Sequence, residues 1–136
     1  MEEKKIILVE DDPDHADLIA EVLDDEGIEK NVILVRDGMD AIDCFQELSA
    51  KWNGQMEHKI RMILLDLNLP KIDGMDILKF LKKNPRYSKI PVVILSTSSD
   101  EGTINEAYKN GADDFLTKPL SYEEFVVKLK GLKEQY

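Results

Sequence analysis

MILLDLNLPKIDG, residues 62–74, is the stretch on which the interpretation of the whole chain depends. Its first four residues are apolar, which is typical of a strand buried on both faces of a parallel sheet. Asp66 ends the apolar run, and Pro70 and Gly74 mark a turn beyond it. Open α/β sheets bind ligands at the carboxyl ends of their strands, which is where this pattern places Asp66. Acidic residues also end strands and cap helices for structural reasons, so this stretch alone favours neither role.

Four other segments show the same pattern of an apolar strand followed by an amphipathic helix. The other strands are expected at residues 5–10, 31–36, 91–96 and 114–117. The helix starts are expected at Asp12-Pro13, Asp37-Gly38, Asp73-Gly74, Ser98 with Glu101, and Ser121 with Glu124. Residues 49–59 lose the helical periodicity and are expected to form an extended connection. Five successive strand–helix units predict one α/β domain with a parallel sheet covered on both faces.

The composition is that of one globular domain of 136 residues, with 43% hydrophobic and 34% charged residues. No apolar run is long enough to cross a bilayer, and the first residues lack a signal peptide, so we expect a cytoplasmic protein that does not bind membranes. The net charge of −10 disfavours binding to nucleic acid. The single cysteine, Cys44, lies in an apolar helical pattern and is expected to be a core residue.

Polar and charged side chains follow four of the predicted strands. In chain order they are Glu10, Asp11, Asp66, Ser96 and Lys118. Parallel strands end at a common edge of their sheet, so we expect these groups to lie close together. This shared position favours a functional role for Asp66 over a purely structural one.

The motifs resemble the CheY-like receiver domain of two-component response regulators, over essentially the whole chain. The resemblance is carried by VEDD at residues 9–12, LLDLNLPKIDG at 64–74, VVILSTS at 92–98 and TKP at 117–119. It implies a flavodoxin-like, doubly wound sheet of five parallel strands in the order 2-1-3-4-5, flanked by five helices. It also implies a single receiver domain over residues 1–136, without an output domain. The finer pattern is most similar to stand-alone regulators that work with phytochrome-type histidine kinases.

The resemblance assigns chemistry to the strand-end groups. Asp66 would accept a phosphoryl group from a phosphohistidine of a sensor histidine kinase and form an aspartyl phosphate. Mg²⁺ would neutralise the negative charges that this reaction brings together. Its ligands would be the carboxylates of Glu10, Asp11 and Asp66 and the backbone carbonyl of Asn68. Lys118 would contact the phosphoryl oxygens, and its bond to Pro119 would be a cis peptide.

Other positions concern the switch that follows phosphorylation. Ser96 matches the hydroxyl that would donate a hydrogen bond to the phosphoryl group, while Ser98 is expected to cap the next helix. Phe115 matches the aromatic residue that reorients with this loop, although core packing explains it equally well. Thr97 and Asn68 flank the site and are expected to influence how long the phosphoryl group persists.

Two residues near the acidic turn receive structural interpretations. Asp12 is assigned to helix capping. His15 begins a helix near the acidic pocket, so a contact with the pocket stays open, but it is assigned to the surface because a lone histidine lacks metal-ligand spacing.

The resulting hypothesis is a phosphorylation-controlled switch that is not an enzyme and acts on an unknown downstream protein. A homodimer through the last two helices and the fifth strand is also expected from the resemblance. Two alternatives stay open: a degenerate receiver that only binds partners, and a phosphatase of the haloacid-dehalogenase type. The phosphatase is disfavoured because its acid–base aspartate, two residues after the nucleophile, is replaced here by Asn68.

Overall fold

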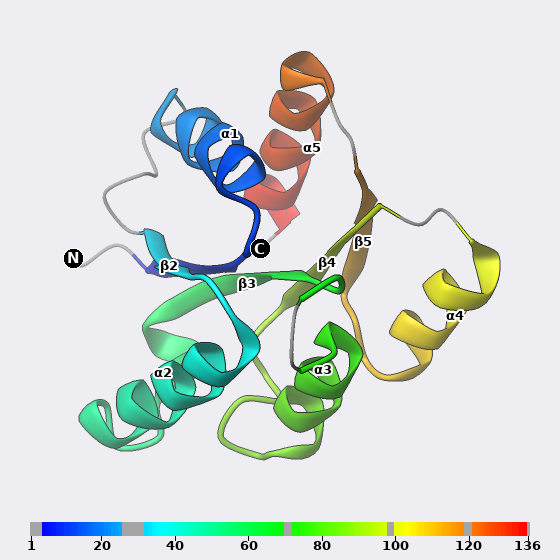
Figure 1. Ribbon diagram of the computed structural model, residues 1–136. Helices are drawn as coiled ribbons and strands as arrows, with labels where there is room; N and C mark the ends of the chain where they lie inside the picture. The colour runs from blue at the N-terminus through cyan, green and yellow to red at the C-terminus, as the bar shows by residue number, and fades with distance from the viewer. Residues whose placement is uncertain (1–3, 26–31, 70–71, 98–99, 119–120, 136) are drawn as a thin grey trace.

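The computed structural model has three layers, with helices on both faces of one sheet (Figure 1). It describes residues 4–25, 32–69, 72–97, 100–118 and 121–135. The strands are β1 (Lys5–Val9), β2 (Val32–Val35), β3 (Ile60–Asp66), β4 (Val92–Ser96) and β5 (Asp114–Thr117). The helices are α1 (Pro13–Asp25), α2 (Gly38–Lys51), α3 (Gly74–Lys83), α4 (Glu101–Lys109) and α5 (Tyr122–Gln135), with a short 3-10 helix, η2 (Met56–His58), after α2.

The sheet has five parallel strands in the order β2-β1-β3-β4-β5, which confirms the expected topology. Helices α1 and α5 cover one face, and α2, α3 and α4 cover the other (Figure 1). The central strands are buried on both faces, which explains why their sequences are continuously apolar. The register pairs Val9 with Leu65, Asp66 with Leu95 and Ser96 with Thr117, so the carboxyl ends of these strands lie side by side.

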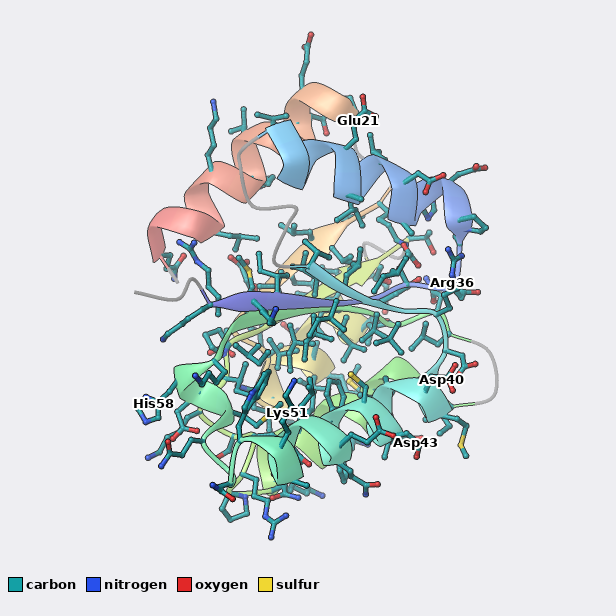
Figure 2. All side chains as sticks on the ribbon, turned by 90° about the vertical axis from the view of Figure 1, so that its left-hand side faces the viewer. Glu21, Arg36, Asp40, Asp43, Lys51 and His58 are labelled. Atoms are coloured by element: carbon teal, nitrogen blue, oxygen red, sulfur yellow. The ribbon has the colours of Figure 1, made fainter. Side chains whose placement is uncertain are left out.

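Two hydrophobic clusters fill the spaces on either side of the sheet, because successive side chains of a strand point to opposite faces. Ile7 and Val9 of β1 belong to the larger cluster under α2 to α4, and Ile6 and Leu8 belong to the cluster under α1 and α5. Charged side chains such as Asp43 lie on the outside of the helices (Figure 2). Among the described helices, none has both the length and the apolar character needed to cross a membrane.

The expectation of an extended connection over residues 49–59 is wrong. Helix α2 continues to Lys51, and η2 follows after a turn. The buried positions here are Ser49 and Met56, while Trp52 is half-buried against the larger cluster. The periodicity was hidden because one of the inward positions of α2 is a serine.

Most predicted helix starts are confirmed, but the start of α4 is not. The side chains of Asp37, Asp73 and Ser121 accept hydrogen bonds from the first turns of α2, α3 and α5. Helix α4 begins at Glu101 instead, with Asp100 as its cap accepting a bond from the N–H of Thr103. Ser98, the expected cap, lies outside the described residues.

Candidate functional site

The turn between β1 and α1 consists of three acidic residues, 10–12, at the edge of the sheet. Asp12 ends this turn, and its Oδ1 accepts hydrogen bonds from the N–H groups of Asp14 (2.9 Å) and His15 (3.3 Å). The expected capping role of Asp12 is therefore confirmed. Glu10 and Asp11 are fixed between the end of the strand and this cap.

Asp66 is the last residue of β3 and is only 2% exposed. Its Oδ1 accepts a hydrogen bond from the N–H of Asn68 at 2.9 Å, which orients the carboxylate. The backbone behind it is packed against Gly74, where an added Cβ would lie 2.4 Å from the carbonyl oxygen of Asp66. Gly74 therefore allows α3 to begin directly against the end of β3.

The three acidic residues expected to bind a metal come together. One carboxylate oxygen from each of Glu10, Asp11 and Asp66 lies within 4.8 Å of the others. Glu10 is fully buried, and burial together with hydrogen bonding to Asp66 raises its pKa from 4.5 to about 8. Its second oxygen, Oε2, is buried and has no hydrogen-bond partner among the described residues. A buried, unpartnered carboxylate oxygen beside two other carboxylates fits a divalent cation with oxygen ligands.

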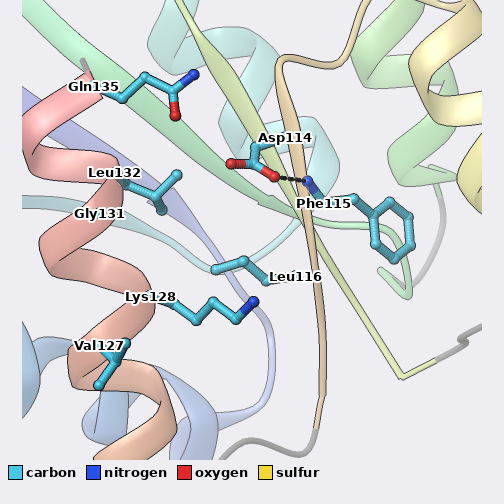
Figure 3. A pocket seen from close by; sticks show the side chains of 8 residues that line it. All are labelled: Asp114, Phe115, Leu116, Val127, Lys128, Gly131, Leu132 and Gln135. Atoms are coloured by element: carbon cyan, nitrogen blue, oxygen red, sulfur yellow. Dashed lines mark hydrogen bonds between the residues drawn. The ribbon is translucent and has the colours of Figure 1, made fainter.

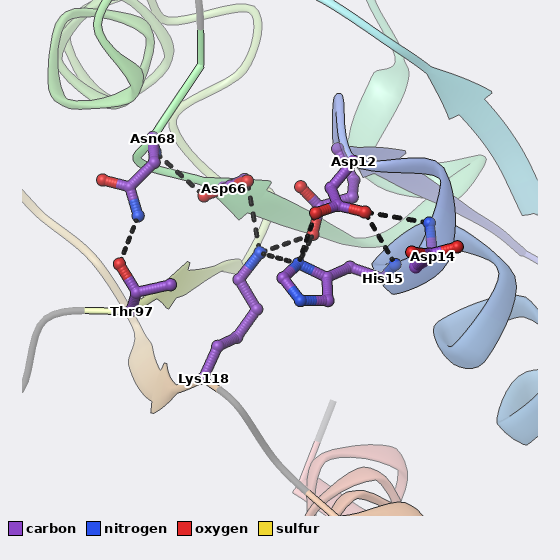
Figure 4. Close-up of polar contacts among 8 residues, drawn as sticks. Asp12, Asp14, His15, Asp66, Asn68, Thr97 and Lys118 are labelled. Carbon is purple, nitrogen blue, oxygen red and sulfur yellow. Dashed lines mark hydrogen bonds and ion pairs between the residues drawn. The ribbon is translucent and has the colours of Figure 1, made fainter.

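Lys118 reaches into this acidic cluster from the end of β5 (Figure 4). Its Nζ lies 2.5 Å from Glu10 Oε1 and 3.2 Å from Asp66 Oδ2, and the residue is only 7% exposed. Its backbone N–H donates to the carbonyl of Ser96, which ties the ends of β4 and β5 together. The ammonium group thus neutralises part of the charge of the carboxylates.

The other predicted site residues lie around Lys118 and the acidic cluster. Ser96 is buried at the end of β4. The side-chain amide of Asn68 donates to the hydroxyl of Thr97 at 3.0 Å, so these two exposed residues connect the loops after β3 and β4 (Figure 4). Phe115, on β5, is half-buried and packs against the larger hydrophobic cluster. The expected cis peptide at Lys118 involves Pro119, which lies outside the described residues.

A cavity of about 230 Å³ opens above these groups. It is lined by Asp11, Asp12, His15, Asp66, Asn68, Thr97 and Lys118. The cavity exposes a carboxylate, an ammonium group and an acidic cluster to the same small volume. This combination suits the binding of a cation together with a small anion.

His15 is the residue whose position the sequence interpretation missed. Its Nδ1 lies 3.1 Å from the Nζ of Lys118 and 3.5 Å from Glu10 Oε1. The ring is 32% exposed and lines the cavity, so the residue is not simply on the surface. The available signal was its place in the first turn of α1, three residues after the cap, because helical side chains lean toward the amino end of their helix.

Comparisons with known proteins agree with this arrangement. The model of the response regulator receiver domain family matches residues 6–130. Probable methanogenesis regulatory protein FilR2 of Methanothrix harundinacea is 37% identical over 131 residues, covering 96% of this chain and 82% of FilR2. Response regulator Rcp1 of Synechocystis is 36% identical over 132 residues, covering 96% of this chain and 86% of Rcp1.

Solved structures of response regulators have the same fold as this chain. The phosphorylated cyanobacterial phytochrome response regulator RcpA has a TM-score of 0.82 at 37% identity, over 98% of this chain and 93% of RcpA. The Mn²⁺-bound form of Rcp1 has a TM-score of 0.81 at 35% identity, over 97% of this chain and 93% of Rcp1.

Proposed function

The chain belongs to the response regulator receiver domain family, and on that premise we propose that Asp66 is the residue that accepts the phosphoryl group. One observation carries this assignment. The carboxylate of Asp66 faces the cavity with two other carboxylates within 4.8 Å and the ammonium group of Lys118 at 3.2 Å. A buried carboxylate placed between a cation site and an ammonium group is suited to nucleophilic attack on an anionic phosphoryl donor.

The divalent cation is proposed to be Mg²⁺, held by the carboxylates of Glu10, Asp11 and Asp66. The unpartnered Oε2 of Glu10 and the Mn²⁺-bound structure of the relative Rcp1 support a divalent metal at this cluster. The backbone carbonyl of Asn68 is proposed as a further ligand. When bound, the cation reduces the repulsion between the attacking carboxylate and the phosphoryl oxygens.

The residues of this chain then have distinct tasks in the transfer. An oxygen of Asp66 bonds to phosphorus as the bond from phosphorus to the histidine nitrogen of the kinase breaks, and that nitrogen keeps the bonding electrons. Lys118 turns from the carboxylates toward the phosphoryl oxygens, and Ser96 donates its hydroxyl hydrogen to them. Phe115 follows the loop after β4 as it closes. Asn68 and Thr97 limit the access of water and so set the lifetime of the aspartyl phosphate.

This assignment describes a signalling domain and not an enzyme that turns over an external substrate. The phosphatase alternative requires an acid–base group two residues after Asp66. Asn68 occupies that position, and its amide donates to Thr97 instead. The degenerate receiver, which only binds partners, would show no measurable affinity for Mg²⁺.

The partners are proposed from the relatives and from one surface. RcpA is named a phytochrome response regulator, which supports a phytochrome-type histidine kinase as phosphodonor in the cytoplasm. We propose that α4, β5 and α5 form a homodimer or contact the downstream protein, with no role for nucleic acid or membranes. Val127 on α5 is 69% exposed and Tyr108 on α4 is 45% exposed. A cavity of about 230 Å³ also lies between β5 and α5 (Figure 3).

The test uses the mass of the intact protein after incubation with Mg²⁺ and phosphoramidate, a small-molecule phosphodonor. Wild type is expected to gain the mass of one phosphoryl group, and Asp66→Asn is expected to gain none, because an amide is not a nucleophile for phosphorus. Asp43→Asn, at an exposed position of α2, is the matched control and should be modified like wild type. Modification of Asp66→Asn to the same extent as wild type would refute the assignment.

A further inference from the structure

We propose that His15 is a positioning residue for Lys118, which it holds next to Asp66 through a hydrogen bond from Lys118 Nζ to His15 Nδ1. The distance between these atoms is 3.1 Å, although the residues are 103 positions apart in the chain. The inference rests on the proposed function of Asp66 and Lys118 and adds a residue that controls where the lysine lies.

The chemistry of the two groups fixes the direction of this hydrogen bond. An ammonium group has three N–H donors and no lone pair, so Nδ1 of His15 must be the acceptor. An imidazole that accepts this hydrogen bond at Nδ1 carries its ring hydrogen on Nε2. The carboxylates near Nδ1, Glu10 at 3.5 Å and Asp12 at 3.7 Å, are farther from it than the ammonium group.

Lys118 has three acceptors among the described residues, one for each of its N–H groups. They are Glu10 Oε1, Asp66 Oδ2 and His15 Nδ1. Of these three, His15 is the one that is not a carboxylate. It is also the only one outside the acidic cluster that is proposed to bind the cation.

This difference decides what happens to the lysine when a cation binds. Oxygens of Glu10 and Asp66 that held the cation would attract the ammonium group less strongly. The lone pair of His15 is not required by the cation and remains available. His15 thus keeps the ammonium group beside Asp66, ready for the phosphoryl oxygens, without neutralising its charge.

The position of the ring is itself well determined. His15 lies in the first turn of α1, where its own N–H donates to the Oδ1 of Asp12 at 3.3 Å. Because the capped turn fixes the backbone, the ring can approach Lys118 from only a few rotamers. A side chain on a flexible loop would not restrict the lysine in the same way.

The experiment combines variants at positions 15 and 118 with two kinds of measurement. The first is the rate constant for modification of Asp66 by phosphoramidate at saturating Mg²⁺, together with the affinity for Mg²⁺. His15→Ala is expected to lower the rate constant about threefold to tenfold while the Mg²⁺ affinity stays within about twofold of wild type. His15→Asn, whose amide oxygen can accept the same hydrogen bond, should recover most of the rate. The control, His58→Ala, removes the other histidine, whose side chain is 68% exposed, and should match wild type.

The second measurement does not depend on phosphorylation. The ¹⁵N NMR resonance of His15 Nδ1 in the metal-free protein should move when Lys118→Ala removes the donor. In the Lys118→Ala background, His15→Ala should cause no further loss of rate, because the two residues act through one contact.

Three results would overturn the inference. They are an unchanged rate constant in His15→Ala, a loss of rate caused by His15→Ala in the Lys118→Ala background that equals its loss in wild type, and an Nδ1 resonance that does not move in Lys118→Ala. If wild type itself is never modified, the proposed function fails instead. The NMR measurement would then still decide whether His15 and Lys118 are hydrogen-bonded.

Discussion

Two lysines at opposite edges of the sheet show how differently the same ion-pair chemistry can be used. At the amino edge, Lys82 Nζ donates to Asp113 Oδ2 (2.9 Å) and to the carbonyls of Ile90 (2.8 Å) and Ser88 (3.3 Å). The same oxygen of Asp113 accepts the N–H of Val92. One ammonium group, one carboxylate and backbone groups thus join α3 to the starts of β4 and β5.

At the carboxyl edge, the charges do not balance. Lys118 meets a cluster of three carboxylates, and the buried Oε2 of Glu10 has no hydrogen-bond partner in the part of the chain that the structure describes. The Lys82 network is complete within the protein, whereas the Lys118 network contains a buried carboxylate that is satisfied by a proton, as its raised pKa indicates, or would be satisfied by a further cation. The comparison indicates that the contacts of the amino edge hold the fold together, whereas the geometry of the carboxyl edge suits a divalent cation.

The largest effect is expected from removing one carboxylate at the carboxyl edge. Asp11→Asn is expected to weaken Mg²⁺ binding about 100-fold, because a neutral amide replaces an anionic ligand. Isothermal titration calorimetry measures this directly. Lys82→Met is the matched control, and an equal loss of affinity in that variant would contradict the proposed division of roles.

The second prediction addresses the other edge. Lys82→Met is expected to lower the free energy of unfolding by about 1–2 kcal/mol, since it removes the hydrogen bonds from the ammonium group to Asp113 and to two backbone carbonyls. Urea denaturation followed by circular dichroism gives this value. Phosphorylation of Asp66 should proceed at the wild-type rate, and a slower reaction would show that the two edges are not independent.

The third prediction concerns the pH dependence of the free energy of unfolding, which can be measured on the unchanged protein. The pKa of Glu10 is raised from 4.5 to about 8 in the folded protein, so the folded state binds more protons than the unfolded state between these values. The free energy of unfolding of the metal-free protein should therefore fall as the pH rises through this interval.

Denaturation in EDTA at several pH values tests this expectation. Glu10→Gln should flatten the dependence, because the amide does not titrate. A stability that instead rises with pH in the wild type over this interval would contradict the raised pKa.

Much of the fold was predictable because the signals are local. Continuous apolar runs mark the central strands, and aspartates such as Asp12, Asp37 and Asp73 cap the helices that follow. The shared edge of parallel strands then brings Glu10 and Asp66 together without any knowledge of side-chain packing.

The features that the sequence did not reveal depend on tertiary contacts. His15 meets Lys118 only because the lysine side chain reaches from the end of β5 to the first turn of α1, a contact between residues 103 positions apart in the chain. The partners of Lys82 include two backbone carbonyls, which residue types cannot identify because every residue has a carbonyl. The buried, unpartnered oxygen of Glu10 likewise follows from packing and not from residue type.

The contact at Gly74 limits which parts of the domain can move relative to one another. Because this glycine lies against the carbonyl of Asp66, the first turn of α3 packs directly on the end of β3, with no room for a side chain between them. On the other side of Asp66, the backbone link from Lys118 to Ser96 ties β5 to β4. A displacement that starts at the aspartate should therefore travel toward α4 and β5, and the α3 side should serve as the fixed frame against which that motion is measured.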